Sequence, residues 1–283
     1  MNIQAIWTDE LTEQFPKENY KKIMQFMDLL DLLKDKTIVI NQDEGSVYEC
    51  EDFVDWLYSR KEPELSDIKK ELMIKMTKYS HCKDTQIKQL KREIGKMQPQ
   101  KYFALDFRED ADLYYAATVR GMYSICRKYL SMESKSEFKE DMEFCFPDIY
   151  FDKTVPSSLN SLNRKFEEIR TEIVEHLIAL NEYRANFLHQ NEDNKSYRDI
   201  AAEFQRDTGI ECSPQGDKKM LDILKRDFKN KCTGHNEKIN CELHTKFNRF
   251  NKDKEKQDRI YFAPAKKGIC SDRVIVVHIG GHL

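Results

Sequence analysis

The segment 272-DRVIVVHIGGHL-283 places four β-branched residues ahead of a histidine, two glycines and a second histidine. β-Branched side chains fit a pleated, buried surface, so the pattern predicts a strand over 273–280. Chain ends commonly fray, yet two imidazoles stand within the final six positions. We therefore expect the end of this chain to be held against a folded sheet.

The composition indicates a globular protein of one or two domains. The chain has 283 residues, of which 40% are hydrophobic and 34% are charged, so it has enough apolar surface to offset chain entropy. It contains no apolar run long enough to span a membrane, and its start, MNIQAIWTDELTEQF, lacks the regions of a signal peptide. The eight cysteines are scattered, which favours reduced thiols. We expect a cytoplasmic protein without a membrane segment.

The net charge of −3 conceals an uneven distribution. From Lys218 to Leu283 the chain has 16 Lys and Arg against 8 Asp and Glu, so this stretch carries about +8 and the preceding residues about −11. Such a basic segment either meets a polyanion or folds against the acidic part. Uneven surface charge without any partner is the alternative interpretation.

Residues 1–195 are predicted to form a helix-rich regulatory or interaction region. Apolar residues at spacings of three and four predict helices at 17–33, 51–60, 66–96 and 108–130. Alternating β-formers predict a hairpin within 37–50 and a strand at 101–107. Two prolines and a broken pattern predict an elbow near 146–157.

A long apolar stripe follows Ser158, which is a good N-cap residue. Apolar residues continue at helical spacing from Leu159 to Leu180, and we expect one helix over 158–188. Such a helix either forms a spine for the N-terminal region or pairs with a second copy as a homodimer. The polar stretch at 189–196 then predicts the main linker.

Residues 196–283 are predicted to form a small basic module. Helices are expected at 197–208 and 217–230, followed by strands in INCELHTKF (239–247), RIYFAPA (259–265) and RVIVVHIG (273–280). The predicted fold class is therefore α+β: a mostly helical N-terminal region, then a C-terminal module of two helices packed on an antiparallel sheet.

Histidines concentrate in this module. Four of the seven in the chain lie at 235, 244, 278 and 282. Side chains alternate along a strand, so His244 and Lys246 share one face of the first strand, and Arg259 and Tyr261 share one face of the second. This gathering of imidazole and cationic side chains is the strongest functional signal in the sequence.

The order of helices, a strand ending in basic residues, RIYF and a hydrophobic final strand with a histidine together resemble the RelE/HigB/YoeB family of bacterial toxins. The resemblance covers roughly residues 198–283, and about 190 residues precede it. It implies helices on a twisted antiparallel sheet and a ribonuclease that cuts messenger RNA, in many members on the ribosome. It also implies that His244 and Lys246, then Arg259, and finally His278 or His282 supply the catalytic groups.

The chemistry of RNA cleavage requires a base for the 2′-hydroxyl, positive charge for the phosphorane and an acid for the leaving 5′-oxygen. Histidine suits both proton transfers because its unperturbed pKa lies near 6.5. In this interpretation His244 or Glu242 is the base and His282 is the acid. Lys246 and Arg259 stabilise the developing charge, and no cofactor or metal is expected.

The same residues allow other interpretations. Arg249, Lys252, Lys254 and Tyr261 are the expected RNA contacts, although the lysines equally fit a solvated turn. His278 follows four apolar residues and equally fits a buried histidine bonded to a carbonyl.

A zinc site is a further alternative. Its ligands would be Cys232, His235, Cys241 and His244, a C-x2-H-x5-C-x2-H pattern. A metal-bound His244 could not serve as a base, so this alternative competes with catalysis.

Two functions from different classes follow. The first is a bacterial endoribonuclease of a toxin–antitoxin or antiviral defence system, with RNA and an antitoxin or defence protein as partners. The second is a non-catalytic subunit whose basic module binds nucleic acid or an acidic protein.

Overall fold

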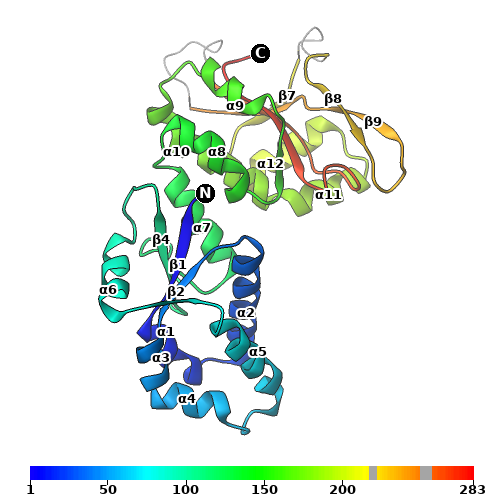
Figure 1. Cartoon of the computed structure of the whole chain (residues 1–283). Coiled ribbons are helices and arrows are strands. Elements are labelled where there is room, and N and C mark those ends of the chain that lie inside the picture. Colours follow the sequence, from blue (N-terminus) through cyan, green and yellow to red (C-terminus); the bar gives the residue numbers. More distant parts are fainter. Residues whose placement is uncertain (217–221, 249–256) are drawn as a thin grey trace. The chain divides into compact units, whose positions relative to one another are not determined.

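The computed structural model describes residues 1–216, 222–248 and 257–283, and it divides the chain into two compact units (Figure 1). Unit 1 is Met1–Tyr129 and unit 2 is Leu130–Leu283. Each unit has its own sheet. The boundary that the sequence predicts near 195 therefore falls inside unit 2.

A parallel sheet forms the centre of unit 1. Its strands are β1 (Ile3–Trp7), β2 (Ile40–Asp43), β3 (Ser80–Cys82), β4 (Lys101–Leu105) and β5 (Tyr115–Ala116), in the order β3-β2-β1-β4-β5. β1 pairs with β2 on one side, where Ala5 is opposite Ile40, and with β4 on the other, where Ala5 is opposite Phe103. The strand order therefore reverses between β1 and β4, which is where α/β sheets of this kind commonly bind ligands.

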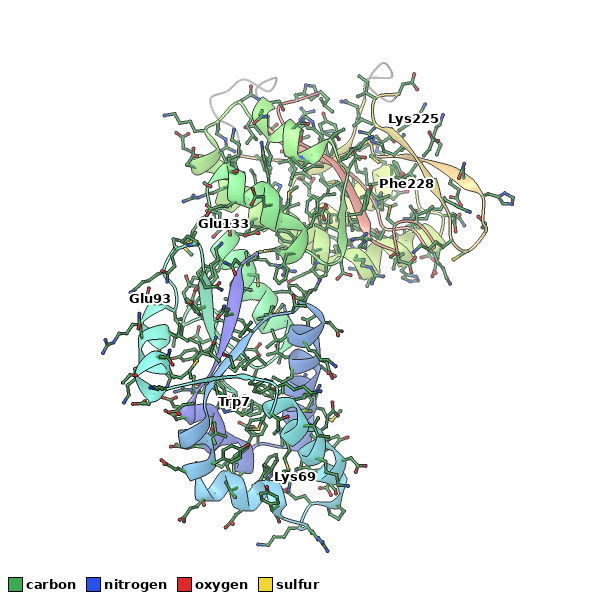
Figure 2. The ribbon with its side chains drawn as sticks, viewed as in Figure 1. Trp7, Lys69, Glu93, Glu133, Lys225 and Phe228 are labelled. Carbon is green, nitrogen blue, oxygen red and sulfur yellow. The ribbon has the colours of Figure 1, made fainter. Side chains whose placement is uncertain are left out.

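Helices connect these strands and enclose an aromatic core. They are α1 (Asp9–Gln14), η1 (Phe15–Lys17), α2 (Tyr20–Asp35), α3 (Glu44–Glu49), α4 (Glu51–Tyr58), η2 (Pro63–Leu65), α5 (Ser66–Met76), α6 (Asp84–Glu93) and α7 (Val119–Leu130). Trp7 of β1 stacks on Phe15 with ring centroids 5.6 Å apart and meets Phe26 edge-on at 5.9 Å (Figure 2). Large aromatic side chains contribute most of the apolar area that a core buries.

Several predictions for this region are confirmed and others are wrong. The predicted elements at 17–33, 51–60 and 101–107 correspond to α2, α4 and β4. The hairpin predicted within 37–50 is wrong, because β2 pairs in parallel with β1 and α3 follows it directly. β3 interrupts the helix predicted over 66–96, and the helix predicted from 108 begins only at Val119.

Strand β2 shows why the sequence pattern led to a wrong prediction of a hairpin. It reads INQD, yet Asn41 and Gln42 are buried. The side-chain amide of Asn41 donates to the Gln4 side-chain oxygen at 2.9 Å, and that of Gln42 donates to the Met76 carbonyl at 3.1 Å. Because these hydrogen bonds allow polar residues inside the unit, the strand has no apolar alternation.

A mixed sheet forms the centre of unit 2. Its strands are β6 (Ile149–Phe151), β7 (Cys212–Pro214), β10 (Leu243–Lys246), β11 (Arg259–Ala263) and β12 (Val274–Gly280), in the order β6-β12-β11-β10-β7. β6 is parallel to β12, and the other pairs are antiparallel. β12 is therefore flanked on both sides, which explains its continuous run of buried β-branched residues.

The two faces of this sheet are covered by different elements. The helices of unit 2 are α8 (Lys135–Cys145), α9 (Val155–Ser158), η3 (Leu159–Ser161), α10 (Phe166–Glu182), α11 (Arg184–Glu192) and α12 (Tyr197–Thr208). Phe187 of α11 and Phe204 of α12 pack on Phe262 at 5.7 and 6.2 Å. Toward the other face, the hairpin of β8 (Lys225–Lys229) and β9 (Asn236–Asn240) brings Phe228 edge-on to Tyr150 of β6 at 5.7 Å (Figure 2).

The predicted fold class is wrong. Unit 1 is an α/β unit with a parallel sheet, and the antiparallel strands of the expected module belong to a mixed sheet that also includes β6. The helix at 197–208 is confirmed as α12, whereas β8 occupies residues predicted as the helix 217–230. A structure of two helices on a purely antiparallel sheet does not describe this arrangement.

The single helix predicted over 158–188 is also wrong. The segment contains α9, η3, α10 and the start of α11, and Leu162 has an extended backbone between η3 and α10. Buried residues along α10 include Ile169, Ile173 and Leu177, so the apolar stripe packs inside unit 2. It does not offer the surface that the predicted homodimer required.

Across residues 1–216, 222–248 and 257–283, the helices are too short or too polar for any of them to cross a membrane.

Candidate active site

A polar row crosses four strands of the unit 2 sheet. Ser213 of β7 is opposite His244 of β10. Tyr261 of β11 lies between His244 and His278 of β12, with ring centroids 4.9 and 5.7 Å away. Directly opposed side chains project from the same face of a sheet. The structure therefore brings together the predicted site residues of three strands.

A second row lies beside the first. Lys246 is opposite Arg259, and Arg259 is opposite Gly280. Each of these residues is two positions from a member of the first row, so both rows share one face. The predicted cations and imidazoles thus occupy one patch of sheet, which we call the two-row site: Ser213, His244, Lys246, Arg259, Tyr261 and His278.

His244 is buried and oriented by two hydrogen bonds. Its Nδ1 donates to the Glu242 carbonyl at 3.4 Å, because a carbonyl oxygen only accepts. Its Nε2 then accepts from the Ser213 hydroxyl, with 3.2 Å between the two atoms. This fixes the tautomer of the neutral ring and points its basic nitrogen toward β7.

The surroundings of His244 keep it neutral. Burial is the main reason that its pKa falls from the usual value to about 3, and the neighbouring charges of Arg259, Lys246 and His282 lower it further. The site therefore has a positive potential before any ligand binds.

Arg259 is the most unusual member of the site. The residue is 8% exposed, and its Nη1 donates to the Tyr261 hydroxyl at 3.3 Å. Its Nε is buried without a hydrogen-bond partner, and among the described residues no carboxylate forms an ion pair with it. A buried, unpaired cation is costly, and buried charges are normally paired.

Tyr261 anchors the end of the chain. Its hydroxyl accepts from Arg259, from the Gln215 side chain at 3.3 Å and from the Leu283 backbone at 3.4 Å. Gln215 also donates to a main-chain oxygen of Leu283 at 3.3 Å. Tyr261 is fully buried, so it positions Arg259 and the segment 280–283 rather than presenting a surface for base stacking.

His278 also binds the segment 280–283. Its Nε2 donates to the Gly281 carbonyl at 3.0 Å, and burial lowers its pKa. The structure thus favours the interpretation of His278 as a buried histidine bonded to a carbonyl.

The two glycines allow a close approach between backbones. A Cβ atom on Gly280 would lie 2.6 Å from the Ser158 carbonyl, and one on Gly281 would lie 2.8 Å from the Ser161 carbonyl. The Gly281 N–H donates to that Ser161 carbonyl at 3.1 Å. The segment after β12 is therefore held by contacts that only glycine permits at these positions.

Lys246 and His282 lie at the accessible edge of the site. Lys246 pairs with Glu211 at 2.6 Å, and His282 is exposed. A polar cavity of about 710 Å³ adjoins Lys246, with Glu172 and His176 in its wall. Its volume is in the range of small-molecule pockets.

Three of the predicted RNA contacts, Arg249, Lys252 and Lys254, lie outside the described residues. The fourth, Tyr261, is buried as described above.

The four residues of the zinc pattern are not gathered around one point. Cys241 belongs to the core under the β8–β9 hairpin, where burial raises the pKa of its thiol to about 12. Cys232 is exposed, and His244 is bonded to Ser213. Within the described parts of the chain, no three His, Cys, Asp or Glu side chains are placed to hold a metal ion.

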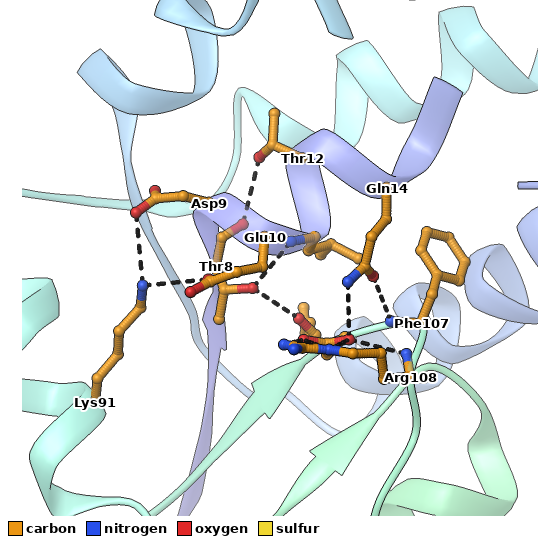
Figure 3. Close-up of polar contacts among 11 residues, drawn as sticks. Thr8, Asp9, Glu10, Thr12, Gln14, Lys91, Phe107 and Arg108 are labelled. Carbon is orange, nitrogen blue, oxygen red and sulfur yellow. Dashed lines mark hydrogen bonds and ion pairs between the residues drawn. The ribbon is translucent and has the colours of Figure 1, made fainter. Parts of the chain in front are cut away.

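Unit 1 has a polar network where its strand order reverses (Figure 3). Asp106, directly after β4, is buried and pairs with Arg108, and it also accepts from the Gln14 side chain at 3.2 Å. These bonds outweigh burial and hold the pKa of Asp106 below its usual value. The Thr8 hydroxyl donates to the Leu105 carbonyl at 3.3 Å. The hydrogen-bonding groups of Asp106, Arg108 and Gln14 therefore satisfy one another.

The sequence analysis missed two residues: Ser213, a member of the two-row site, and Gln215, which bonds to Tyr261 and Leu283. Ser213 and Gln215 lie in or next to β7, in ECSPQG, which reads as a loop because of its Pro and Gly. β7 has only three residues, too few for a periodic signal. The only available signal was the polar alternation of Glu211, Ser213 and Gln215.

Comparisons with protein-family models, curated proteins and solved structures find no match to this chain. The resemblance to RelE-like toxins therefore stays a prediction that rests on sequence pattern.

Proposed function

We propose that unit 2 is a metal-independent RNA endonuclease that acts at the two-row site. The main support for the proposal is Arg259, because the residue is buried and its Nε has no hydrogen-bond partner among the described residues. A phosphate suits such a group, since the planar guanidinium donates to two phosphate oxygens at once. A bound phosphodiester would supply the missing negative charge.

The proposed reaction is an internal transfer within the RNA. The 2′-oxygen bonds to phosphorus as the bond from phosphorus to the 5′-oxygen breaks, leaving a 2′,3′-cyclic phosphate and a 5′-hydroxyl. One proton leaves the 2′-hydroxyl and another reaches the departing 5′-oxygen, so no oxidant or metal is consumed. The protein must supply a base, an acid and positive charge.

His244 is the proposed base. It is neutral in the free protein, with its Nε2 available to accept a proton. Its low pKa makes it a weak base at first, and a phosphate dianion or diester beside Arg259 would raise that pKa by offsetting the positive surroundings. Ser213 would release Nε2 when the substrate hydroxyl takes its place. His282, which is exposed, is the proposed acid.

Lys246 and Arg259 are proposed to stabilise the charge of the phosphorane. Tyr261 and His278 are proposed as positioning residues, since both are bonded inside the protein.

The biological setting remains as the sequence predicts it. We propose a cytoplasmic bacterial enzyme that arrests growth in a toxin–antitoxin or antiviral defence system, with RNA, on the ribosome or free, as its substrate. An antitoxin or defence protein would be its partner, and unit 1 would serve regulation or targeting.

The burial of His244 favours a second candidate. Its side chain is 3% exposed, so a substrate hydroxyl reaches it only after a local opening. A module that binds nucleic acid or an acidic protein without cleavage does not require a substrate hydroxyl to reach His244.

Inducible expression of the intact chain, followed by mapping of RNA ends, separates the two candidates. The segment 196–283 alone is unsuitable because it lacks β6, α10 and α11, which complete the sheet and cover it. An endonuclease gives new RNA ends and growth arrest, and Arg259→Gln removes both. Growth arrest without new ends supports the binding module.

Arg206→Gln is the matched control. Arg206 lies on α12 of the same unit with its side chain 70% exposed, and its substitution changes the net charge equally. Arg206→Gln should leave RNA cleavage unchanged.

A further inference from the structure

An apolar cavity lies in unit 1, away from the polar network of Figure 3. It occupies about 630 Å³ between α2, α5 and the segment that leads into β2. α2 and α5 pack against each other, as Figure 1 shows. Residues just before β2 and β3 line it, so it opens at the amino ends of these strands. The network around Asp106 lies after β4, at the opposite, carboxyl end of the sheet.

The walls of the cavity are mostly aliphatic. Leu30 of α2, Ile38 and Ile40 near β2 and Ile74 of α5 line it. Ile74 is 58% exposed and the neighbouring Val39 is 43% exposed. Apolar side chains left open to water in a concave site gain free energy when a ligand covers them.

The rim of the cavity is cationic. Its lining contains Lys34, Lys75 and Lys78 against a single carboxylate, Glu71, a difference of two positive charges. Lys75 pairs with Asp31 and with Glu71 at 3.1 Å. Lys34 and Lys78 are exposed and form no ion pair among the described residues. Two lysines therefore remain for an anion at the mouth of an apolar space.

Besides Lys34 and Lys78, the cavity contains a third polar side chain without a hydrogen-bond or ion-pair partner among the described residues, that of Tyr79. It lines the cavity, and its hydroxyl is buried without a hydrogen-bond partner in the described chain. A buried hydroxyl without a partner is costly, and an oxygen acceptor on a ligand would relieve that cost.

We propose that this cavity binds a free amphipathic monocarboxylate with an unbranched alkyl chain. The aliphatic walls suit the chain, and Lys34 and Lys78 suit the carboxylate. At about 30 Å³ for a water-sized group, the cavity has room for roughly twenty such groups, so a chain of medium length fits inside it. This inference is independent of the proposed ribonuclease activity.

Titration calorimetry of the intact chain tests the proposal. The probes are decanoate, dodecanoate and tetradecanoate below the concentrations at which they aggregate, with dodecanol and dodecyltrimethylammonium for comparison. We expect one site whose affinity rises about two- to fourfold for each added methylene until the cavity is full. Dodecanoate should bind at least about tenfold more tightly than the cation of equal chain length, because the rim is positive.

Variants locate the site. The double variant Lys34→Glu/Lys78→Glu should weaken dodecanoate binding about tenfold or more and leave dodecanol binding unchanged. Ile74→Asp should weaken both probes. Lys88→Glu is the matched control for a charge reversal, because Lys88 lies on α6 outside the cavity, with its side chain 65% exposed. It should bind all probes as the unaltered chain does.

Several results would overturn the proposal. These are no binding of any probe, affinity that does not depend on chain length, and equal binding of the carboxylate and the cation. Binding that survives Lys34→Glu/Lys78→Glu would place the carboxylate elsewhere. Association with anionic phospholipid vesicles but not with free carboxylates would identify a membrane surface as the ligand instead.

Discussion

The Nη1 of Arg259 donates to the hydroxyl of Tyr261, 3.3 Å away, and this is the one hydrogen bond of that side chain within the described residues. The two residues lie on the same face of β11, two positions apart. Tyr261 therefore holds the guanidinium in place without neutralising it. A cation held in this way is prepared for an anion that the described residues do not supply.

Arg259→Met is expected to stabilise the protein while it removes the proposed activity. Replacing a buried, unpaired charge with an apolar side chain removes a desolvation cost, so unfolding should require about 1 kcal/mol more free energy. Urea denaturation of the variant and the unaltered chain measures the difference. A loss of more than about 2 kcal/mol would show that Arg259 has a structural partner.

Inorganic phosphate is expected to stabilise unit 2 through Arg259. A ligand that binds only the folded state adds about 2.7 kcal/mol when its concentration is one hundred times its dissociation constant. The midpoint of urea denaturation should therefore rise with phosphate in the unaltered chain, compared at equal ionic strength with chloride. Arg259→Met should abolish this difference. An equal response in both proteins would mean that phosphate acts elsewhere.

Stability should fall as the pH falls from about 6.5 to 4, and His176 supplies a defined part of this slope. Burial lowers the pKa of His176 to about 4. Between about pH 6.5 and pH 4 the histidine is therefore protonated in the unfolded chain but neutral in the folded chain. The contribution of the neutral His176 ring to the free energy of unfolding is therefore fully present above about pH 6.5 and is lost as the pH falls toward 4. At pH 5 the loss is roughly 2 kcal/mol.

Urea denaturation at pH 7 and pH 5 measures this slope. His176→Gln should reduce the difference between the two pH values, whatever it does to absolute stability. His189→Gln is the control, because the His189 side chain is 76% exposed on α11. An unchanged slope in His176→Gln would show that His176 is not buried as a neutral ring.

Gly280→Ala should release the segment that follows β12. The added methyl would lie 2.6 Å from the Ser158 carbonyl, so the backbone must move, at a cost of about 1–3 kcal/mol. Hydrogen exchange should then increase at the Gly281 and Leu283 amides. Gly45→Ala is a useful comparison, because the nearest atom to the added methyl there is a side-chain oxygen of Asp43 at 3.5 Å, an ordinary van der Waals contact. Unchanged exchange in Gly280→Ala would contradict the close approach.

The sequence predicted the strands that carry a clear pattern and failed where polar residues are buried. The run RVIVVHIG became β12, and RIYF became β11, because β-branched and aromatic residues were continuous there. β3, which reads SHC, gave no such signal, and β2, which reads INQD, lay within the segment predicted as a hairpin. Both are short and depend on pairing with neighbours that are distant in the sequence.

The parallel sheet was missed for the same reason. Pairing of β1 with β4 joins residues about one hundred positions apart, and nothing local to Ile3–Trp7 specifies that partner. Likewise β6 joins the unit 2 sheet across more than one hundred residues, so the region before 196 looked like a separate helical part. Local periodicity predicts elements, and it does not predict which strands meet.

The site was more predictable than the fold. Alternation along each strand placed His244 with Lys246 and Arg259 with Tyr261, and the register then aligned these pairs on one face. The burial of Tyr261 and the bond from His278 to the Gly281 carbonyl required tertiary structure, because both depend on how the chain folds over the sheet.

The most direct test is the cleavage of a defined RNA by the intact protein, with and without ribosomes, and chemical identification of the new ends. We predict a 2′,3′-cyclic phosphate and a 5′-hydroxyl, no cleavage when a 2′-deoxynucleotide replaces the attacking residue, and a rate at least about one hundredfold lower in Arg259→Gln. Cleavage that persists with the 2′-deoxynucleotide, or RNA that stays intact under both conditions, would contradict the proposed activity.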